Sequence, residues 1–214
     1  MKERVAVYSI VRGRPEMTKQ SFQSLRDKAG MSFEHIIHDN SKHNIGLQAA
    51  SNKVLELCRR EGYEYMVRFD NDIIVESDDI LAKLVDCCKK LENRIMLSPH
   101  VKGIVHQPER FGNVEIEGGY DVAFVEMIGG TLRLIPTKLL DTFYWDVRHP
   151  MGIAETAYLC KWLKDQKPAI PMAYIENLFV SHGESTHKQI ANAPVYFAEH
   201  TCFQRYPYVP PFSC

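Results

Sequence analysis

The first 92 residues alternate short runs of β-branched and aromatic residues with longer amphipathic segments. The β-rich runs lie at residues 4–10, 33–39 and 63–70. The amphipathic segments, with apolar residues at helical spacing, lie at residues 16–30, 44–62 and 76–92. This β-α-β-α-β-α order predicts an α/β fold with a mixed, mostly parallel sheet flanked by helices.

Local signals predict where these helices begin and end. Gly30 and Gly62 follow the first two amphipathic segments and are expected to stop them. Ser77 is expected to cap the third helix, because its hydroxyl can accept a hydrogen bond from a free backbone N–H. Asp78 and Asp79 follow it and suit the positive end of the helix dipole.

Acidic residues fall at the ends of the second and third β-rich runs. Asp39 ends the second run, and Asp70 and Asp72 lie at the end of the third, in the stretch MVRFDNDIIV. Ligands of open α/β sheets bind beyond the carboxyl ends of the strands. We therefore expect the functional site at this edge.

The second half of the chain is less regular. Further elements are predicted as a strand at 94–99, a helix at 153–165 and a late strand at 173–183. Residues 101–120 predict a loop or a small hairpin, and two β-rich runs flank Gly129 and Gly130. No internal repeat or linker is evident, so all 214 residues are expected to form one domain.

Composition limits the function classes without selecting one. The formal net charge is −1, so no overall basic field favours nucleic acid or an anionic membrane. Six scattered cysteines without a C-x-x-C pair predict reduced thiols and no zinc ribbon. Neither a secretory signal nor an apolar stretch of membrane-spanning length is recognised, and a cytoplasmic protein is expected.

The pair Asp70 and Asp72 is unusual for the end of a buried strand, because positions i and i+2 of a strand project to the same side. Two neighbouring carboxylates repel each other unless a cation lies between them or one is protonated. Mg²⁺ commonly combines one or two carboxylates with substrate phosphates. The pair therefore suits a divalent metal held against a diphosphate, although Asp and Asn are equally typical of a surface turn.

Several stretches in order resemble the GT-A glycosyltransferases, in particular family 2, which have a Rossmann-like nucleotide-diphospho-sugar transferase fold. The matching stretches, which cover roughly residues 4 to 188, are YSIVRGRPEMTKQSFQSL, IIHDNSKHNIGLQAASNKVLE, VRFDNDIIV, EMIGGTLRLIP and FVSHGEST. The order of the motifs is more specific than any one of them. The resemblance divides the chain into a nucleotide-sugar-binding half (1–100), an acceptor and catalytic half (101–188) and a C-terminal tail or lid (189–214).

The resemblance also implies roles for individual residues. Asp39 would contact the nucleoside, with the other donor-binding residues being Tyr8, Arg12, Asn44, Arg68 and Asp70. The metal, Mn²⁺ or Mg²⁺, would be held by Asp72 and His182, with Asp70 beside it. Gly129 and Gly130 would line the acceptor side. His182 has the plain alternative of a surface histidine at a strand end.

The catalytic base is implied less directly. Family 2 enzymes usually carry a Glu-Asp pair at the start of a late helix, and the Asp deprotonates the acceptor. Here Glu155 falls at the position of the base and Ala154 at that of the preceding Glu. Glu155 is the expected base and Asp146 the reserve, while a helix N-terminal Glu favoured by the dipole is the alternative.

The implied reaction is metal-dependent transfer of a hexosyl or pentosyl group, with inversion, from a UDP-sugar to an acceptor hydroxyl. The acceptor is expected to be a saccharide, with a hydroxymethylated DNA base as a second option. Three other functions stay open: a nucleotide-sugar-binding module without turnover, a sugar nucleotidylyltransferase, and a haloacid dehalogenase-type phosphohydrolase. The last fits poorly, because its Asp pair normally follows the first strand.

Overall fold

The computed structural model describes residues 3–41, 43–103, 108–148 and 152–182. Its elements are β1 (Val5–Val11), α1 (Pro15–Lys28), β2 (Glu34–Asp39), α2 (Leu47–Glu61), β3 (Tyr65–Phe69), β4 (Ile73–Val75), α3 (Ile80–Lys90), β5 (Met96–Lys102), β6 (Arg110–Ile116), β7 (Tyr120–Val125), β8 (Leu132–Pro136), the 3₁₀ helix η1 (Thr137–Leu140), α4 (Gly152–Asp165) and β9 (Met172–His182). The predicted β-α-β-α-β-α order of the first half is confirmed.

One mixed sheet forms the centre of the fold. Its strand order is β2-β1-β3-β8-β5-β9-β7-β6, and β4 pairs with β9 off this path. The pairs β1–β2, β1–β3 and β5–β9 are parallel. The other strand pairs of the described chain are antiparallel. The α/β sheet flanked by helices is as predicted, and the contiguous parallel part is the trio β2, β1 and β3.

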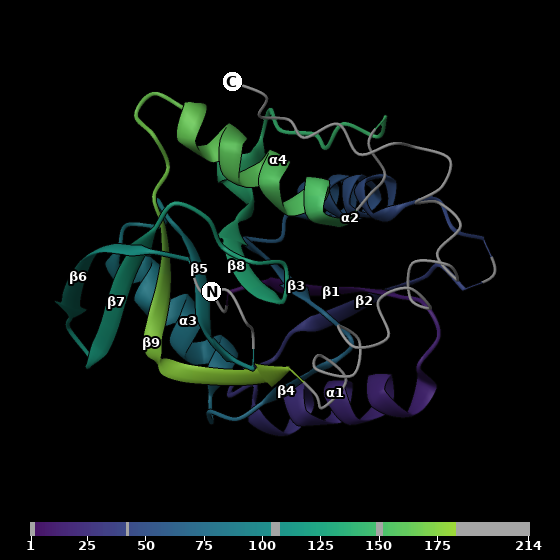
Figure 1. Ribbon diagram of the computed structural model, residues 1–214, viewed down its shortest axis with the longest axis horizontal. Helices are drawn as coiled ribbons and strands as arrows, with labels where there is room; N and C mark the ends of the chain where they lie inside the picture. The colour runs from purple at the N-terminus through teal and green to yellow at the C-terminus, as the bar shows by residue number, and fades with distance from the viewer. Residues whose placement is uncertain (1–2, 42, 104–107, 149–151, 183–214) are drawn as a thin grey trace.

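Helices cover both faces of the sheet. Helices α2 and α4 lie together on one face, and α1 and α3 lie on the other, so the sheet is the middle of three layers (Figure 1). Side chains that alternate along a strand therefore point to two different helix pairs. This alternation determines which polar side chains of the strands are buried beneath a helix pair.

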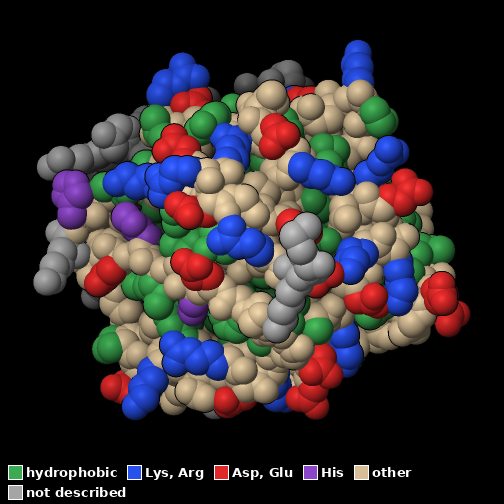
Figure 2. Space-filling view, turned by 180° about the vertical axis from the view of Figure 1, so that it is seen from behind, with side chains coloured by type: hydrophobic (Ala, Val, Ile, Leu, Met, Phe, Trp, Pro, Cys, Tyr) green, Lys and Arg blue, Asp and Glu red, His purple; other side chains and the backbone are tan. Residues whose placement is uncertain are grey.

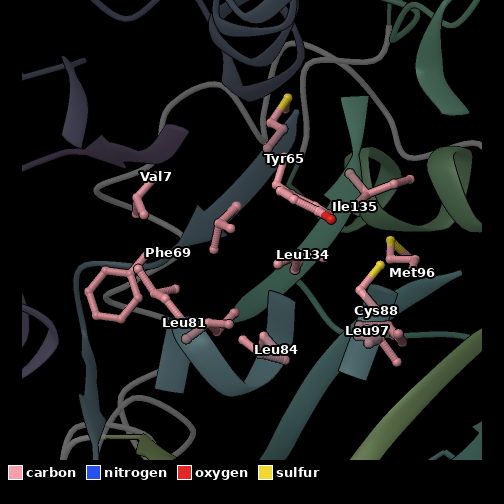
Figure 3. Close-up of a cluster of buried hydrophobic side chains, with 14 of the residues drawn as sticks. Val7, Tyr65, Phe69, Leu81, Leu84, Cys88, Met96, Leu97, Leu134 and Ile135 are labelled. Carbon is pink, nitrogen blue, oxygen red and sulfur yellow. The ribbon is translucent and has the colours of Figure 1, made fainter. Parts of the chain in front are cut away.

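The main apolar core lies between the sheet and α3. Leu81, Leu84 and Cys88 of α3 face Phe69 and Leu134 of the sheet (Figure 3). All five side chains are 0% exposed. Burying a leucine or phenylalanine side chain stabilises a fold by roughly 1.5–3 kcal/mol. This core fixes β3, and so also the strand end that carries Asp70.

The start of α3 differs from the prediction. Ser77 does not cap the helix, which begins at Ile80 after Asp79 in a left-handed conformation with φ 58°. Instead, the Ser77 hydroxyl accepts a hydrogen bond from the N–H of Phe179 at 2.8 Å. This hydrogen bond between distant parts of the chain replaces the predicted local cap. It holds the loop before α3 against β9. Gly62 does end α2 as predicted, with φ 70°.

The segment after β5 forms a hairpin, one of the two predicted alternatives, which extends beyond residue 120 to Val125. β6 and β7 pair antiparallel and extend the sheet at its far edge, with Gly118 and Gly119 at positive φ in the turn. The strand expected at residues 94–99 starts at Met96 and continues to Lys102. The expected tail or lid at residues 189–214 lies outside the described residues.

The charge distribution on the surface and the state of the cysteines match the expectations from the composition. On the face drawn in Figure 2, lysines and arginines are interspersed with aspartates and glutamates. Cys58, Cys87, Cys88 and Cys160 are free and buried. Burial raises the pKa of the Cys87 thiol to about 12, so it stays protonated at neutral pH.

Within the part of the chain that the structure describes, no helix has the length and apolar character needed to cross a membrane.

Candidate active site

Three loops meet at the carboxyl ends of the parallel strands β1, β2 and β3. The loops are residues 12–14, 40–46 (without 42) and 70–72. The N–H of Asn40 donates to the carbonyl of Val11 at 2.8 Å, and the N–H of Gly13 donates to Ser41 Oγ at 3.1 Å. The first two loops are thus held side by side, at the edge where the sequence predicts a ligand site.

Three predicted donor-binding residues lie exposed on this edge: Arg12, Asp39 and Asn44. Asp39 Oδ1 accepts a hydrogen bond from the N–H of Ser41 at 2.8 Å, and Asn44 Oδ1 accepts one from the N–H of Gly46 at 2.9 Å. These short-range bonds shape the loop that leads into α2.

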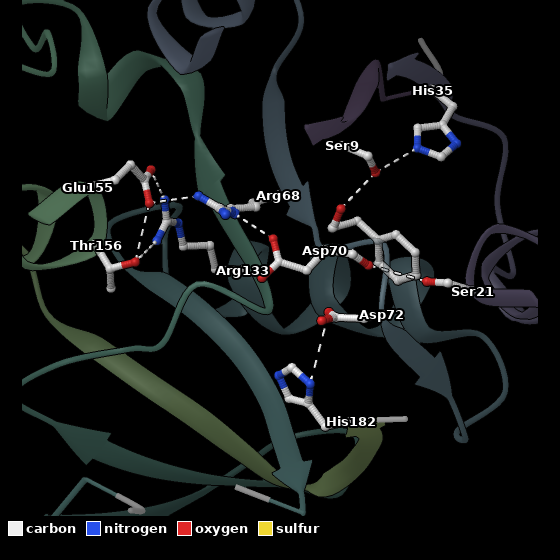
Figure 4. A network of polar contacts seen from close by, with 11 residues as sticks. Ser9, Ser21, His35, Arg68, Asp70, Asp72, Arg133, Glu155, Thr156 and His182 are labelled. Atoms are coloured by element: carbon white, nitrogen blue, oxygen red, sulfur yellow. Dashed lines mark hydrogen bonds and ion pairs between the residues drawn. The ribbon is translucent and has the colours of Figure 1, made fainter. Parts of the chain in front are cut away.

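Asp72 and His182 come together through main-chain pairing. Strand β4, which the sequence analysis missed, pairs antiparallel with the end of β9 and sets Ile73 opposite His182. Asp72 precedes Ile73, so its Oδ1 lies 3.9 Å from His182 Nδ1 (Figure 4). Both side chains are 14% exposed. The sequence order of the motifs predicted this meeting, although residues 72 and 182 are far apart along the chain.

The donor atoms at this point fit a divalent metal that also takes ligands from a diphosphate. His182 Nδ1 is buried and has no hydrogen-bond partner within the described residues. A carboxylate oxygen and a neutral imidazole nitrogen are suitable ligands for Mn²⁺. The described part of the chain has no group of three His, Cys, Asp or Glu side chains placed to hold a metal. A metal here would therefore need phosphate or water oxygens as further ligands.

Asp70 is oriented differently from Asp72. Its Oδ1 accepts a hydrogen bond from Arg68 Nε at 2.9 Å, and its N–H donates to the carbonyl of Thr131 at 2.8 Å. Desolvation raises the pKa of Asp70, and the charge of Asp72 adds to this, whereas Arg68 opposes it. The Asp70 carboxylate is thus turned toward the buried Arg68, although its own side chain is still 27% exposed.

A row of polar side chains runs across the neighbouring strands β1, β3 and β8, beneath the loops at the carboxyl ends of β1 and β3. Tyr8 on β1 pairs with Arg68 on β3, and Arg68 pairs with Arg133 on β8. All three point toward the α2 and α4 face, and their exposed fractions are 1%, 8% and 2%. Alternation along the strands therefore buries Tyr8 and Arg68, unlike the exposed Arg12, Asp39 and Asn44, and donor binding by Tyr8 and Arg68 stays a prediction.

Glu155 is the counter-charge of this row. Its Oε2 accepts from Arg68 Nη1 at 2.7 Å, and its Oε1 forms an ion pair with Arg133 Nη2 (Figure 4). Thr156 Oγ1 donates to Oε2 at 3.2 Å. The carboxylate is 0% exposed. A base must come within hydrogen-bond reach of its substrate, so this burial argues against Glu155 as the residue that deprotonates the acceptor.

Asp146 lies closer to the surface. Its carboxylate is 16% exposed and accepts hydrogen bonds from the Nε of Arg148 at 2.8 and 3.0 Å. The neighbouring Trp145 donates its N–H to Asn52 Oδ1 in the first half of α2 at 2.8 Å. Helix α2 starts beyond the carboxyl end of β2. The segment that carries Trp145 and Asp146 therefore lies near the carboxyl ends of the parallel strands, where the three loops meet. The side chain of Ala154 lies outside the described residues.

The two glycines expected on the acceptor side adjoin the buried row. The N–H of Gly129 donates to the Tyr174 hydroxyl at 3.1 Å. A Cβ on Gly130 would lie 3.1 Å from Thr156 Oγ1 and 3.7 Å from Arg68 Cζ. Gly130 thus allows a close approach of β8 to α4, which is a structural reason for glycine at this position.

A cavity of about 740 Å³ lies elsewhere, between α4 and the β6–β7 edge. Its lining includes Phe111, Met127, Lys161, Lys164 and Met172. Met172 begins β9 and His182 ends it, so this cavity adjoins the end of β9 opposite to the Asp72–His182 pair.

Sequence reasoning missed two arginines that shape the site. Arg14 Nη1 donates to Asp72 Oδ2 at 3.0 Å, and Arg133 holds Glu155. For Arg133 a signal existed, because it is the one charged residue in the apolar run TLRLIP and therefore needs a buried partner. Arg14 carried no comparable signal, since an arginine in a loop is ordinary.

Comparison with known proteins adds evidence on the fold. No family model matches the sequence, and no curated protein matches it. Among solved structures, the mannosyltransferase PcManGT from Pyrobaculum calidifontis, in complex with GDP-Man and Mn²⁺, is similar with a TM-score of 0.59 at 11% identity. That alignment covers 99% of this chain and 67% of PcManGT.

Two further structures are similar. Staphylococcus aureus TarS 1–349 in complex with UDP has a TM-score of 0.58 at 13% identity, over 84% of this chain and 60% of that one. A197 from STIV has a TM-score of 0.56 at 16% identity, over 84% and 85% of the two chains. This chain thus spans less than two thirds of the TarS fragment. The similarity shows that the chain has the fold of GT-A type glycosyltransferases, as its motifs predicted.

Proposed function

We propose that the protein is a metal-dependent glycosyltransferase that moves a sugar from a nucleoside-diphosphate donor to an acceptor hydroxyl. The observation that carries the proposal is the meeting of Asp72 with His182 at the carboxyl ends of the parallel strands, where His182 Nδ1 has no hydrogen-bond partner among the described residues. Neighbours of the same fold bind UDP, UDP-GlcNAc, or GDP-Man with Mn²⁺, which supports a nucleotide-sugar donor here.

Asp72 and His182 would hold Mn²⁺ or Mg²⁺, with Asp70 beside them. When bound, the metal neutralises charge that develops on the leaving diphosphate. Asp39, Asn44 and Arg12 would orient the nucleotide from the two adjoining loops. We propose a UDP-sugar as the donor, of hexosyl or pentosyl type, and a saccharide as the acceptor.

Asp146 is the proposed base in place of Glu155. It would accept the proton of the acceptor hydroxyl while the acceptor oxygen bonds to the anomeric carbon and the bond to the diphosphate breaks. A single displacement of this kind inverts the anomeric centre. The surface position of Asp146 beside the N-terminal half of α2 supports the assignment.

A thermal-shift screen of nucleoside diphosphates and their sugars, each with and without Mn²⁺, tests the proposal. Ligand at 100 times its Kd adds about 2.7 kcal/mol of stability, which raises the Tm of a chain of this size by roughly 5–10 °C. We expect such a shift for one nucleotide and its sugar, and its loss in EDTA. The absence of a shift with every nucleotide would overturn the proposal.

A binding module without turnover is the second candidate, because the expected catalytic Glu155 is fully buried in ion pairs. Slow hydrolysis of the donor in the absence of acceptor, removed by Asp146→Asn, would favour the transferase. A donor that binds and remains intact would favour the module. Release of pyrophosphate from CTP and a free sugar would instead indicate a nucleotidyltransferase, whose fold is represented among the neighbours.

A further inference from the structure

Arg14 forms an ion pair with the carboxylate that the proposed metal would need. Its Nη1 lies 3.0 Å from Asp72 Oδ2, while Asp72 Oδ1 faces His182. Arg14 stands at the N-cap of α1 with φ 57°, and its side chain is 32% exposed. The partly exposed guanidinium of Arg14 thus neutralises the charge of the less exposed Asp72 carboxylate.

The other arginine that bonds to the aspartate pair is held much more firmly. Arg68 is 9% exposed in its side chain, and it bonds to both Asp70 and Glu155. Leaving Asp70 would deprive this almost completely buried guanidinium of one of its two carboxylate partners. Arg14 is partly solvated, so the free-energy cost of exchanging Asp72 for another anion is far lower than the cost of exchanging a partner of Arg68.

A divalent ion on Asp72 would compete with Arg14 for the same carboxylate. Two cations on one carboxylate lie within a few ångströms of each other and repel, unless an additional anion separates them. A diphosphate that binds the metal is such an anion. Guanidinium groups also suit phosphate oxygens, because their planar fork can donate two parallel hydrogen bonds.

We propose that Arg14 is a diphosphate-binding residue, held on Asp72 before the donor arrives and transferred to the diphosphate when metal and donor bind. The inference rests on the proposed function and deepens it. It makes the binding of metal and nucleotide cooperative: metal alone must displace Arg14, whereas metal with diphosphate gives Arg14 a new partner. By linkage, each of the two ligands strengthens the other by the same factor.

Calorimetry with Mn²⁺ and UDP on the full chain tests this transfer, with GDP in parallel. For Arg14→Gln we expect Mn²⁺ alone to bind about 3- to 10-fold more tightly than to the wild type, because a competing cation is gone. UDP in saturating Mn²⁺ should bind about tenfold or more weakly, because a charge-assisted contact is lost. A residue with a purely structural role would not move the two affinities in opposite directions.

Two further variants serve as controls. Arg60→Gln removes an equal charge from an exposed pair with Glu61 and should leave both affinities unchanged. Arg14→Lys keeps the charge but loses the fork, so Mn²⁺ affinity should stay near the wild-type value while UDP affinity falls by several-fold.

The outcomes separate this inference from the proposed function. If the wild type binds Mn²⁺ and UDP but Arg14→Gln binds Mn²⁺ alone with unchanged affinity, the transfer is overturned and the proposed function stands. Parallel weakening of both ligands in Arg14→Gln, with a lowered Tm, also overturns it. If the wild type binds neither Mn²⁺ nor any nucleotide, the proposed function fails and the inference fails with it.

Discussion

The two aspartates of the strand-end loop differ in what holds them. Asp70 is bonded to Arg68, which is itself locked by the buried Glu155. Asp72 is bonded to Arg14, which is partly solvated and belongs to another loop. Two carboxylates that are equivalent in the sequence pattern thus have different partners, a buried arginine for Asp70 and a partly solvated one for Asp72. We propose that the depth of the partner arginine, rather than the aspartate itself, separates a mainly structural role of Asp70 from a metal-binding role of Asp72.

The largest effect should follow from removing the common anchor of the buried row. Glu155→Gln leaves Arg68 and Arg133 without their shared counter-charge in an environment where both are almost completely buried. Breaking a buried ion pair from one side typically costs 3–5 kcal/mol, and we expect a loss of about that size in the free energy of unfolding. Urea denaturation followed by circular dichroism measures it.

The matched control is Glu61→Gln, which removes the same charge from an exposed pair with Arg60 and should cost less than about 1 kcal/mol. A Glu155→Gln protein as stable as the wild type, but with turnover reduced by ~10²-fold, would return Glu155 to the role of catalytic base.

The next effect concerns the metal. Asp72→Asn should weaken Mn²⁺ binding in the presence of UDP by ~10²-fold or more, because an anionic ligand becomes a neutral one. Its free energy of unfolding should change by less than about 1 kcal/mol, since the Arg14 pair is partly exposed. Titration calorimetry with Mn²⁺ decides the first point. Wild-type affinity in this variant would remove Asp72 from the metal site.

Asp70→Asn should affect stability more than Mn²⁺ binding, the reverse of Asp72→Asn. It weakens a bond to a buried arginine, so we expect a loss of about 1–2 kcal/mol in the free energy of unfolding. Mn²⁺ affinity in the presence of UDP should fall by less than about tenfold. If Asp70→Asn abolishes Mn²⁺ binding as fully as Asp72→Asn does, the division between the two aspartates is incorrect.

The last expected effect, no larger than that of Asp70→Asn, is a pH dependence that arises from His35 on β2. His35 Nε2 lies 2.9 Å from Ser9 Oγ, and that hydroxyl donates to the carbonyl of Phe69. Burial, with a smaller contribution from Arg26, lowers the pKa of His35 to about 4. The unfolded chain therefore binds more protons between about pH 6.5 and pH 4, and stability falls as the pH falls through that window.

Because His35 is partly exposed, we expect a loss of about 1–2 kcal/mol between pH 7 and pH 4.5. Thermal denaturation at the two pH values measures it, and His35→Gln should remove most of the difference. An unchanged pH dependence in His35→Gln would assign the effect to carboxylates of the ion-pair network instead.

The sequence predicted the β-α-β-α-β-α half well, because there each element carries its own periodicity and its own stop signal. The edge that bears Asp39, Asp70 and Asp72 followed directly from that order. The role of Glu155 could not be predicted in the same way. Its burial depends on arginines contributed by two other strands, and no local pattern reports which face of the sheet a distant helix will cover.

The pairing of β4 with β9 sets the spacing of the Asp72–His182 pair by backbone geometry alone. Strand register has a period of two, so one extra residue inserted between Asp72 and Ile73 would turn either the carboxylate or the imidazole away from the other. The core between α3 and the sheet would be untouched. Length variation at this single peptide bond would therefore abolish the proposed ion binding in a protein that still folds, whereas a side-chain change at Ile74, the partly exposed residue of β4, should be tolerated.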